Sequence, residues 1–238
     1  MKRNPMIFYK RMLLFAALII SGLMSNAQGW RVGLEGGWLN NTVSRNTQYA
    51  YDYRYQGKNG FDLGVWGQYN FKDWLGVRAD LVWLNRGHKM HRDYTYMNKV
   101  HYTETDGYLA LPVMASFSFG GQKIRGFVNL GGYIGFWATS HWKGAAMSLT
   151  DPVLGDDAFV PYDFDCKRAF DSRRDNRFEA GLVGGAGIDW EFLDKWHVGA
   201  EVRYYYGLTS VTKDYMANFK DPRYNNTLTV MLSFSRAF

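Results

Sequence analysis

Apolar and polar residues alternate along the chain in eight separate segments. Within each segment, large apolar residues fall on one side of a period-2 strand and small or polar residues fall on the other. The segments have about the length of 9 to 11 residues, or slightly more, that a tilted membrane-spanning strand needs. The eight predicted strands are Trp30–Leu39, Phe61–Phe71, Leu75–Arg86, Tyr108–Phe119, Ile124–Ala138, Phe178–Phe192, Trp196–Leu208 and Thr227–Phe238.

The connections between these strands alternate in length. Short turns at one rim and long loops at the other are typical of outer-membrane barrels, with the short turns on the periplasmic side. We therefore predict an all-β fold, an eight-stranded antiparallel up-and-down transmembrane β-barrel with short periplasmic turns and long extracellular loops. The predicted turns are 72–74, 120–123 and 193–195, and the predicted long loops are 40–60, 87–107, 139–177 and 209–226.

Aromatic residues gather at both ends of the predicted strands. Two such girdles are what the two lipid–water interfaces favour. Near the short-turn rim are Trp30, Phe71, Trp74, Phe119, Trp190, Trp196 and Phe238, and near the long-loop rim are Trp38, Phe61, Trp83, Phe136, Phe178 and Tyr206.

The last predicted strand places Phe238, Phe234 and Leu232 on its apolar side. A closing strand that ends on an aromatic residue is typical of bacterial outer-membrane barrels. We expect these three residues to form the signal that the barrel assembly machinery recognises. Arg236 departs from the pattern, because an aromatic or aliphatic residue is usual there.

The first 27 residues have the features of a cleavable secretory signal peptide. Four basic residues flank a short apolar run, and Ser25-Asn26-Ala27 supplies a cleavage site. We predict a signal peptide at 1–27 and an outer-membrane β-barrel domain at 28–238. No Cys lies directly after the apolar run, which argues against a lipid anchor.

Removal of the signal peptide eliminates most of the apparent basic charge. The whole chain has 28 Lys+Arg and 22 Asp+Glu, and residues 28–238 have 24 and 22. This small excess gives no basis for a nucleic-acid partner. Cys166 is the only cysteine, so no internal disulfide can form. No motif indicates a cofactor.

The inward sides of the predicted strands carry charged residues of both signs. An eight-stranded barrel has an interior that side chains just fill, so a general porin is not expected. Unpaired charges in a dry lumen would be costly, and we predict a charge-paired plug. A narrow gated channel is the alternative. The predicted lumen charge network consists of Arg31, Glu35, Arg78, Asp80, Arg125, Asp189, Glu201 and Arg203.

An enzyme that acts on lipid or lipopolysaccharide is a second alternative. His197 falls on the inward side beside Glu191 and Asp189, and Ser233 and Ser235 lie on the next strand. A triad needs a nucleophile within hydrogen-bond reach of a base that a third group orients. This spacing permits a triad but does not specify one, so we predict no catalytic residues.

Two groups in the predicted loops have side chains that bind metals. Imidazoles with a carboxylate suit zinc or copper, and clustered carboxylates suit calcium. Neither group has the spacing of a known motif, so we predict no metal site. The groups are His88, His91, Asp93 and His101, and Asp151, Asp156, Asp157, Asp163 and Asp165.

Three short motifs resemble the PorT-like outer-membrane β-barrel family of Bacteroidota, which are Gram-negative bacteria. They are Val32-Gly-Leu-Glu-Gly-Gly37, Tyr108-Leu-Ala-Leu-Pro-Val113 and Arg203-Tyr-Tyr-Tyr-Gly-Leu208. Ala110 differs from the acidic residue common in the family at that position. The resemblance implies an outer-membrane barrel of the cell envelope, and the family's namesake is linked to protein secretion.

The long loops are the expected functional surface, because a rigid barrel presents them to partners. Residues 139–177 are split between acidic and basic halves, and Tyr49, Tyr51, Tyr53 and Tyr55 alternate in the first loop. Such surfaces suit recognition of protein or glycan. We predict a non-enzymatic surface component or accessory of a secretion or uptake complex. Its surroundings would be outer-membrane lipid and lipopolysaccharide.

Overall fold

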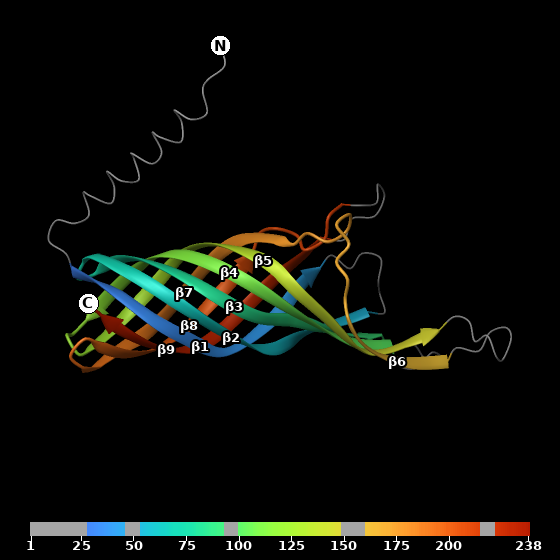
Figure 1. The fold of residues 1–238 in the computed structure, drawn as a ribbon, viewed down its shortest axis with the longest axis horizontal. Coiled ribbons are helices and arrows are strands. Elements are labelled where there is room, and N and C mark those ends of the chain that lie inside the picture. The colour runs from blue at the N-terminus through green and yellow to red at the C-terminus, as the bar shows by residue number, and fades with distance from the viewer. Residues whose placement is uncertain (1–27, 46–52, 93–99, 149–159, 215–221) are drawn as a thin grey trace, which may run out of the picture.

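The computed structural model describes residues 28–45, 53–92, 100–148, 160–214 and 222–238. These residues form nine strands, and eight of them make a closed antiparallel ring in the order β1, β2, β3, β4, β5, β7, β8, β9 (Figure 1). The strands are β1 Gln28–Arg45, β2 Tyr53–Lys72, β3 Leu75–Arg92, β4 Val100–Gly120, β5 Ile124–Ser148, β6 Val160–Lys167, β7 Phe178–Leu193, β8 Trp196–Gly207 and β9 Arg223–Ala237.

The predicted eight-stranded up-and-down barrel is confirmed. The predicted signal peptide at 1–27 lies outside the described residues. Among the described residues, no helix is long and apolar enough to cross a membrane.

The ring closes where the first strand meets the last. β1 and β9 pair without interruption from Arg31 opposite Ala237 to Arg45 opposite Arg223. Closure gives both strands a hydrogen-bonding neighbour on each side, so the ring has no open edge. Leu34 lies opposite Phe234, and both side chains are on the outer face.

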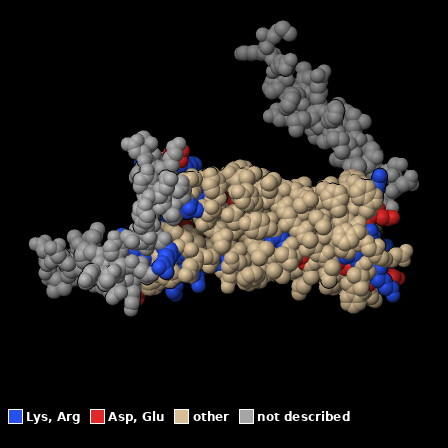
Figure 2. Space-filling view, turned by 180° about the vertical axis from the view of Figure 1, so that it is seen from behind, with Lys and Arg blue, Asp and Glu red and all other residues tan. Residues whose placement is uncertain are grey.

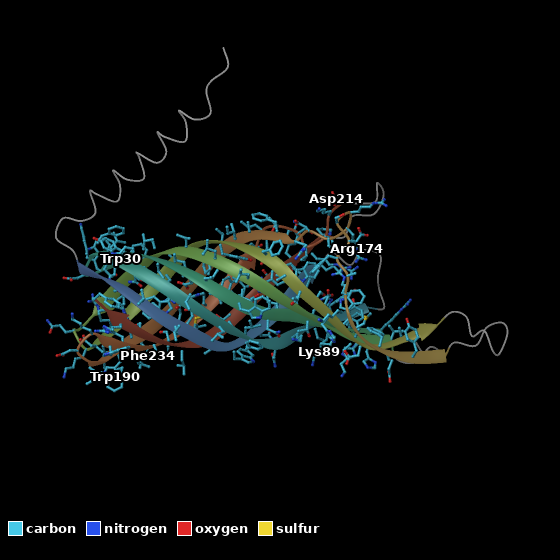
Figure 3. All side chains as sticks on the ribbon, viewed as in Figure 1. Trp30, Lys89, Arg174, Trp190, Asp214 and Phe234 are labelled. Atoms are coloured by element: carbon cyan, nitrogen blue, oxygen red, sulfur yellow. The ribbon has the colours of Figure 1, made fainter. Side chains whose placement is uncertain are left out.

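The two faces of the ring differ as the alternation predicts. Leu34 is 59% exposed on the outside, while the next residue, Glu35, is 3% exposed on the inside. Figure 2 shows few charged side chains around the waist of the barrel and many at its two ends. Trp30, Trp190 and Phe234 lie at the end near the C terminus, and Lys89, Arg174 and Asp214 lie towards the opposite end (Figure 3). The outside is therefore an apolar belt between two polar rims.

Arg236, the residue that departs from the apolar pattern of the last strand, lies on the outer face at the short-turn rim. Its guanidinium carbon is 5.3 Å from the ring centroids of both Trp196 and Phe238. Such cation–π contacts stabilise a guanidinium that stays hydrated on one side. Arg236 thus fits into the aromatic girdle.

At the other rim the strands are longer than predicted and continue into segments that were predicted as loops. β3 continues to Arg92, β4 begins at Val100 and β5 continues to Ser148. Outward-facing residues are apolar only as far as the aromatic girdle, because those beyond it face water. Backbone pairing does not depend on that apolar side, so the strands continue past the girdle.

β6 lies within the segment 139–177 that was predicted as a loop. It pairs with the far end of β5, from His141 opposite Lys167 to Ser148 opposite Val160. The β5–β6 hairpin therefore extends beyond the barrel rim (Figure 1). Cys166 is exposed on this hairpin.

Asp165 on β6 joins the two strands of the hairpin. One carboxylate oxygen lies 2.5 Å from Nε2 of His141, and the other lies 3.0 Å from Nζ of Lys143. These hydrogen bonds, first from Lys143 and then from His141, lower the pKa of Asp165 below its usual value. All three side chains are solvent-accessible, so the contacts fix the hairpin's register more than they stabilise it.

We expect the apolar belt to contact lipid, and a matched pair of substitutions tests this. Leu34→Arg at mid-height should lower the free energy of unfolding by about 2–4 kcal/mol, whereas Leu208→Arg beyond the long-loop girdle should cost about 0–1 kcal/mol. Both leucines are similarly exposed, at 59% and 55%. Urea unfolding in lipid vesicles measures the difference. Equal costs at the two positions would contradict the placement of the belt.

Candidate functional site: the barrel lumen

Five of the eight predicted lumen charges meet at mid-height in one cluster. The strands β1, β3 and β8 each point residues of one parity inward, and this brings the five side chains together across the lumen. All five are buried. This mid-lumen cluster consists of Glu35, Arg78, Asp80, Glu201 and Arg203.

Arg203 is at the centre of the mid-lumen cluster and is 0% exposed. Its Nε and Nη2 donate to the two carboxylate oxygens of Glu201, each over 2.9 Å. Its Nη1 lies 3.2 Å from Glu35 Oε1 and 2.8 Å from Asp80 Oδ2. The fork geometry of a guanidinium suits this arrangement, because one planar group can bind several carboxylates.

Arg78 binds the same three carboxylates from the other side. Its Nε donates to Asp80 Oδ1 over 2.9 Å, its Nη1 to Glu201 Oε2 over 3.3 Å, and its Nη2 to Glu35. The indole of Trp66 lies 4.2 Å from the guanidinium carbon. The cluster thus holds three carboxylates against two guanidinium groups. Asn129 donates to Glu201 Oε1 over 3.1 Å and adds one neutral hydrogen bond.

Apolar and aromatic side chains fill the lumen between the cluster and the long-loop rim. Arg86 is buried there with a partner of its own, Glu179, whose Oε1 lies 2.5 Å from Arg86 Nη1. Glu179 Oε1 also accepts from the Tyr133 hydroxyl over 2.5 Å. The rings of Tyr108, Tyr133 and Tyr205 surround the Arg86 guanidinium, and Leu39, Val82, Leu84 and Ala110 complete the packing.

The segment Arg168–Arg177, which we call the cap, lies against the long-loop end of the barrel. Arg168 joins Glu104 of β4 over 3.2 Å and Asp175 of the cap over 2.5 Å. Its guanidinium also lies about 5 Å from the rings of Trp137 and Trp142, at 5.0 and 5.1 Å. The remaining cavity in this region has a volume of ≈ 40 Å³. Such a space holds little more than one water molecule, whose share of liquid volume is about 30 Å³.

Asp175 holds the cap together. Its Oδ1 accepts from Arg168 and from Arg174 Nε, and its Oδ2 accepts from the backbone N–H of Asp171 over 2.8 Å. Burial raises the pKa of Asp175. The hydrogen bonds from Arg174 and Asp171 and the charge of Arg168 outweigh burial and leave this pKa below its usual value of 3.8.

At the short-turn rim, Arg31 and Asp189 form a separate ion pair over 2.5 Å. Asp189 also accepts from His197 Nδ1 over 3.0 Å, so a carboxylate orients this imidazole. Ser235 lies opposite His197 on β9, but its hydroxyl accepts from Arg31 Nε and Nη2 over 3.2 and 3.0 Å. Asp189 and His197 of the permitted triad are therefore together, and Ser235 is engaged by Arg31.

Arg125, the last predicted lumen charge, lies apart from the mid-lumen cluster. It reaches across the short-turn mouth and donates to the backbone carbonyl of Asp73. Among the residues that the structure describes, no carboxylate lies within ion-pair distance of Arg125.

The candidate metal ligands do not converge. His88 faces the lumen with Nε2 3.6 Å from Glu104, whereas His91 stacks on His101 with ring centroids 6.2 Å apart. In the described part of the chain, no group of three His, Cys, Asp or Glu residues is arranged to hold a metal. Asp93, Asp151, Asp156 and Asp157 lie outside that part, as do Tyr49 and Tyr51.

Several buried charges were missing from the predicted network. The alternation that places Arg78 and Asp80 inward also places Arg86 and His88 inward, so parity alone could have found the charges on β3. Glu104 and Asp106 face inward on β4 by the same alternation, but they lie in the segment 87–107 that was predicted as a loop. The missed lumen charges are Asp62, Arg86, Glu104, Asp106 and Glu179, and Arg168 and Asp175 come from the cap.

The family model described as "Outer membrane protein beta-barrel domain" matches residues 25–213. The chain belongs to this family. The barrel is therefore located in the outer membrane, with its short-turn rim on the periplasmic side and its long-loop rim on the extracellular side. Among curated proteins, none matches the sequence.

Solved structures of small outer-membrane proteins are similar to this family member. OprG of Pseudomonas aeruginosa has 12% identity and a TM-score of 0.49, over 88% of this chain and 97% of that chain. Outer membrane protein W of E. coli has 15% identity and a TM-score of 0.46, over 90% and 100%. Ail of Yersinia pestis has 12% identity and a TM-score of 0.39, over 87% and 99%. These TM-scores are below 0.5, and membership of the family rests on the sequence match alone.

Removal of Arg203 should strongly destabilise the barrel. Arg203→Met leaves buried carboxylates without their main partner, and we expect it to lower the free energy of unfolding by about 3–5 kcal/mol. The double variant Arg203→Met/Glu201→Gln should cost less than the sum of the two single variants, because the two side chains are hydrogen-bonded to each other. Urea unfolding of the four proteins measures this, with Lys123→Met at the exposed periplasmic turn as control. Additive costs would show that the two side chains are not coupled.

The cap should loosen when Asp175 loses its charge. Asp175→Asn removes charge-assisted hydrogen bonds, each contributing about 1.5–3 kcal/mol, so amide exchange in the cap should be at least about tenfold faster at pH 7. In the unsubstituted protein the stabilisation is present above the usual pKa of 3.8 and is lost as pH falls through the lowered pKa. Hydrogen exchange followed by mass spectrometry measures both effects. Asp163→Asn on the exposed hairpin is the control, and unchanged exchange in Asp175→Asn would contradict the role of Asp175.

Proposed function

We propose that this protein is a non-enzymatic component of the outer-membrane surface that presents its extracellular strand extensions to a partner. The observation that carries the proposal is the length of β3, β4 and β5, which continue beyond the extracellular girdle and support the β5–β6 hairpin. A paired sheet already holds its side chains in fixed positions. A partner that binds them therefore does not have to order a flexible loop. This favours a recognition surface over loops that only cover the barrel.

The outer face of this extension carries polar groups suited to recognition. Strand pairing brings Lys89, Thr103, Lys143 and Asp165 into one row across β3, β4, β5 and β6. His91 and His101 stack in the neighbouring row. Charged and aromatic groups side by side are favourable for binding a protein or a glycan.

The lumen supports a closed barrel over a gated channel. Ion pairs fill mid-height, aromatic rings surround Arg86, and the cap is tied to β4 by Arg168. An enzyme acting on lipid is supported less well, because Arg31 binds the hydroxyl of Ser235 and, among the described residues, neither Ser233 nor Ser235 is hydrogen-bonded to His197. We therefore assign the mid-lumen cluster the role of a structural plug.

The proposal includes further features that the sequence indicates. The motifs around Val32, Tyr108 and Arg203 resemble the PorT-like family, whose namesake is linked to secretion, so the partner would belong to a secretion or uptake complex of the envelope. A signal peptide cut after Ala27 would export the chain, and Phe238, Phe234 and Leu232 would address the barrel assembly machinery. Lipopolysaccharide would surround the extracellular rim, and no nucleic acid is expected as a partner.

Removal of the hairpin tests the surface role. Residues 142–166 are replaced by Asn-Gly, which joins the paired residues His141 and Lys167 and leaves the part of β5 within the two girdles intact. We expect the unmodified protein to purify from detergent-solubilised outer membrane with one protein at a fixed ratio. The hairpin variant should lose at least about nine-tenths of that partner while its barrel remains heat-modifiable.

A turn variant at the opposite rim is the matched control. Gly121→Asn/Gln122→Gly rebuilds the periplasmic turn after β4 and should retain the partner. Purification of the unmodified barrel alone would contradict the accessory role. Retention of the partner by the hairpin variant would place the binding surface elsewhere.

A further inference from the structure

A cavity with a volume of ≈ 270 Å³ lies in the periplasmic mouth of the barrel. This space corresponds to about nine water molecules at about 30 Å³ each. It is lined by arginines, small hydroxyl-bearing side chains and amides, with Arg78 of the mid-lumen cluster at its inner end. Its polar lining includes Arg31, Gln68, Asn70, Asp73, Arg78, Ser116, Ser118, Arg125, Asp189, His197 and Ser233.

The positive charges that line the cavity differ in how they are compensated. Arg78 is bound by three carboxylates, and Arg31 is paired with Asp189. Arg125 donates only to the backbone carbonyl of Asp73, and its Nε is buried without a hydrogen-bond partner. Among the described residues, Arg125 is therefore the charge facing this cavity that no carboxylate neutralises. Asp73 also lines the cavity, and its side chain is exposed to water at the rim.

Neutral donors stand next to this uncompensated charge. Ser116, Ser118 and Ser233 line the cavity, and in the described part of the chain their hydroxyls make no hydrogen bonds to other side chains. His197 lines it too, but its Nδ1–H is donated to Asp189, so the neutral imidazole has an acceptor at Nε2 and adds no donor for an anion. A guanidinium that no carboxylate pairs, with hydroxyls beside it, is chemistry that suits an oxyanion.

We propose that the periplasmic mouth is a binding site for an oxyanion, the phosphate ester or carboxylate group of a small periplasmic molecule. Arg125 binds the anion with the terminal guanidinium hydrogens that the Asp73 carbonyl does not accept, and Ser116 and Ser118 add hydroxyl donors. The ion pairs of the mid-lumen cluster close the inner end, so the molecule enters and leaves on the periplasmic side. This site is independent of the extracellular surface proposed above, and either can fail without the other.

Titration of the folded barrel with two small anions tests the site. Methyl phosphate and acetate are added separately to the full mature barrel in detergent micelles, and the Nε–Hε resonance of Arg125 is followed by NMR, assigned with the variant Arg125→Lys. A saturable shift is expected with at least one anion, and the anion with the lower Kd identifies the chemical class. Absence of a saturable shift with both anions would overturn the proposal without any variant.

Two charge-removing variants at the same rim show where the anion binds. Arg125→Gln should weaken binding of the tighter anion at least tenfold, measured by ligand-observed NMR. Lys123→Gln removes an exposed charge two residues away and should leave the Kd within twofold of the unmodified protein. Arg125→Lys retains the charge without the fork and should give an intermediate Kd. Equal weakening by Arg125→Gln and Lys123→Gln would overturn the proposal, because it would show a general effect of rim charge.

Discussion

Inside a bilayer, each backbone N–H and C=O group must find a partner within the protein. In this chain the requirement is met by pairing β1 with β9, which closes the ring. Closure fixes which parity of each strand faces inward, and eight strands leave a lumen that only side chains fill. The content of that lumen therefore follows from the ring, and the strand sequences had to supply inward residues that neutralise one another.

The lumen contains charges of opposite sign that are paired in separate tiers. Arg203 and Arg78 hold Glu35, Asp80 and Glu201, while Arg86 holds Glu179 among aromatic rings. A buried ion pair offers little net stability over apolar packing, but the loss of one partner is costly. Each tier joins strands that are distant in sequence, for example Arg78 on β3 with Glu201 on β8. The tiers therefore select one arrangement of strands across the lumen.

Sequence alone predicted the parts of the structure that lipid determines. Trp30, Leu34 and Trp38 fall on the outer face because lipid contact requires apolar residues at alternate positions, and Glu35 falls inside for the same reason. The strand extensions beyond the girdle were missed, since both faces there meet water or polar groups and the apolar signal ends. The position of Arg125 could not be predicted either. Its long side chain crosses the mouth and donates to a carbonyl on another turn. The alternation of inward and outward residues does not show how far a side chain extends.

The contact of Arg236 with Trp196 and Phe238 bears on how deeply the barrel sits in the membrane. A shift of the barrel towards the cell exterior would draw this guanidinium into hydrocarbon, and a shift towards the periplasm would expose the apolar belt around Leu34 to water. Both displacements raise the free energy, and tryptophan and arginine at an interface resist them together. The arginine that interrupts the apolar pattern of the last strand thus helps to fix the depth of the barrel in the membrane, with the periplasmic mouth at the membrane surface.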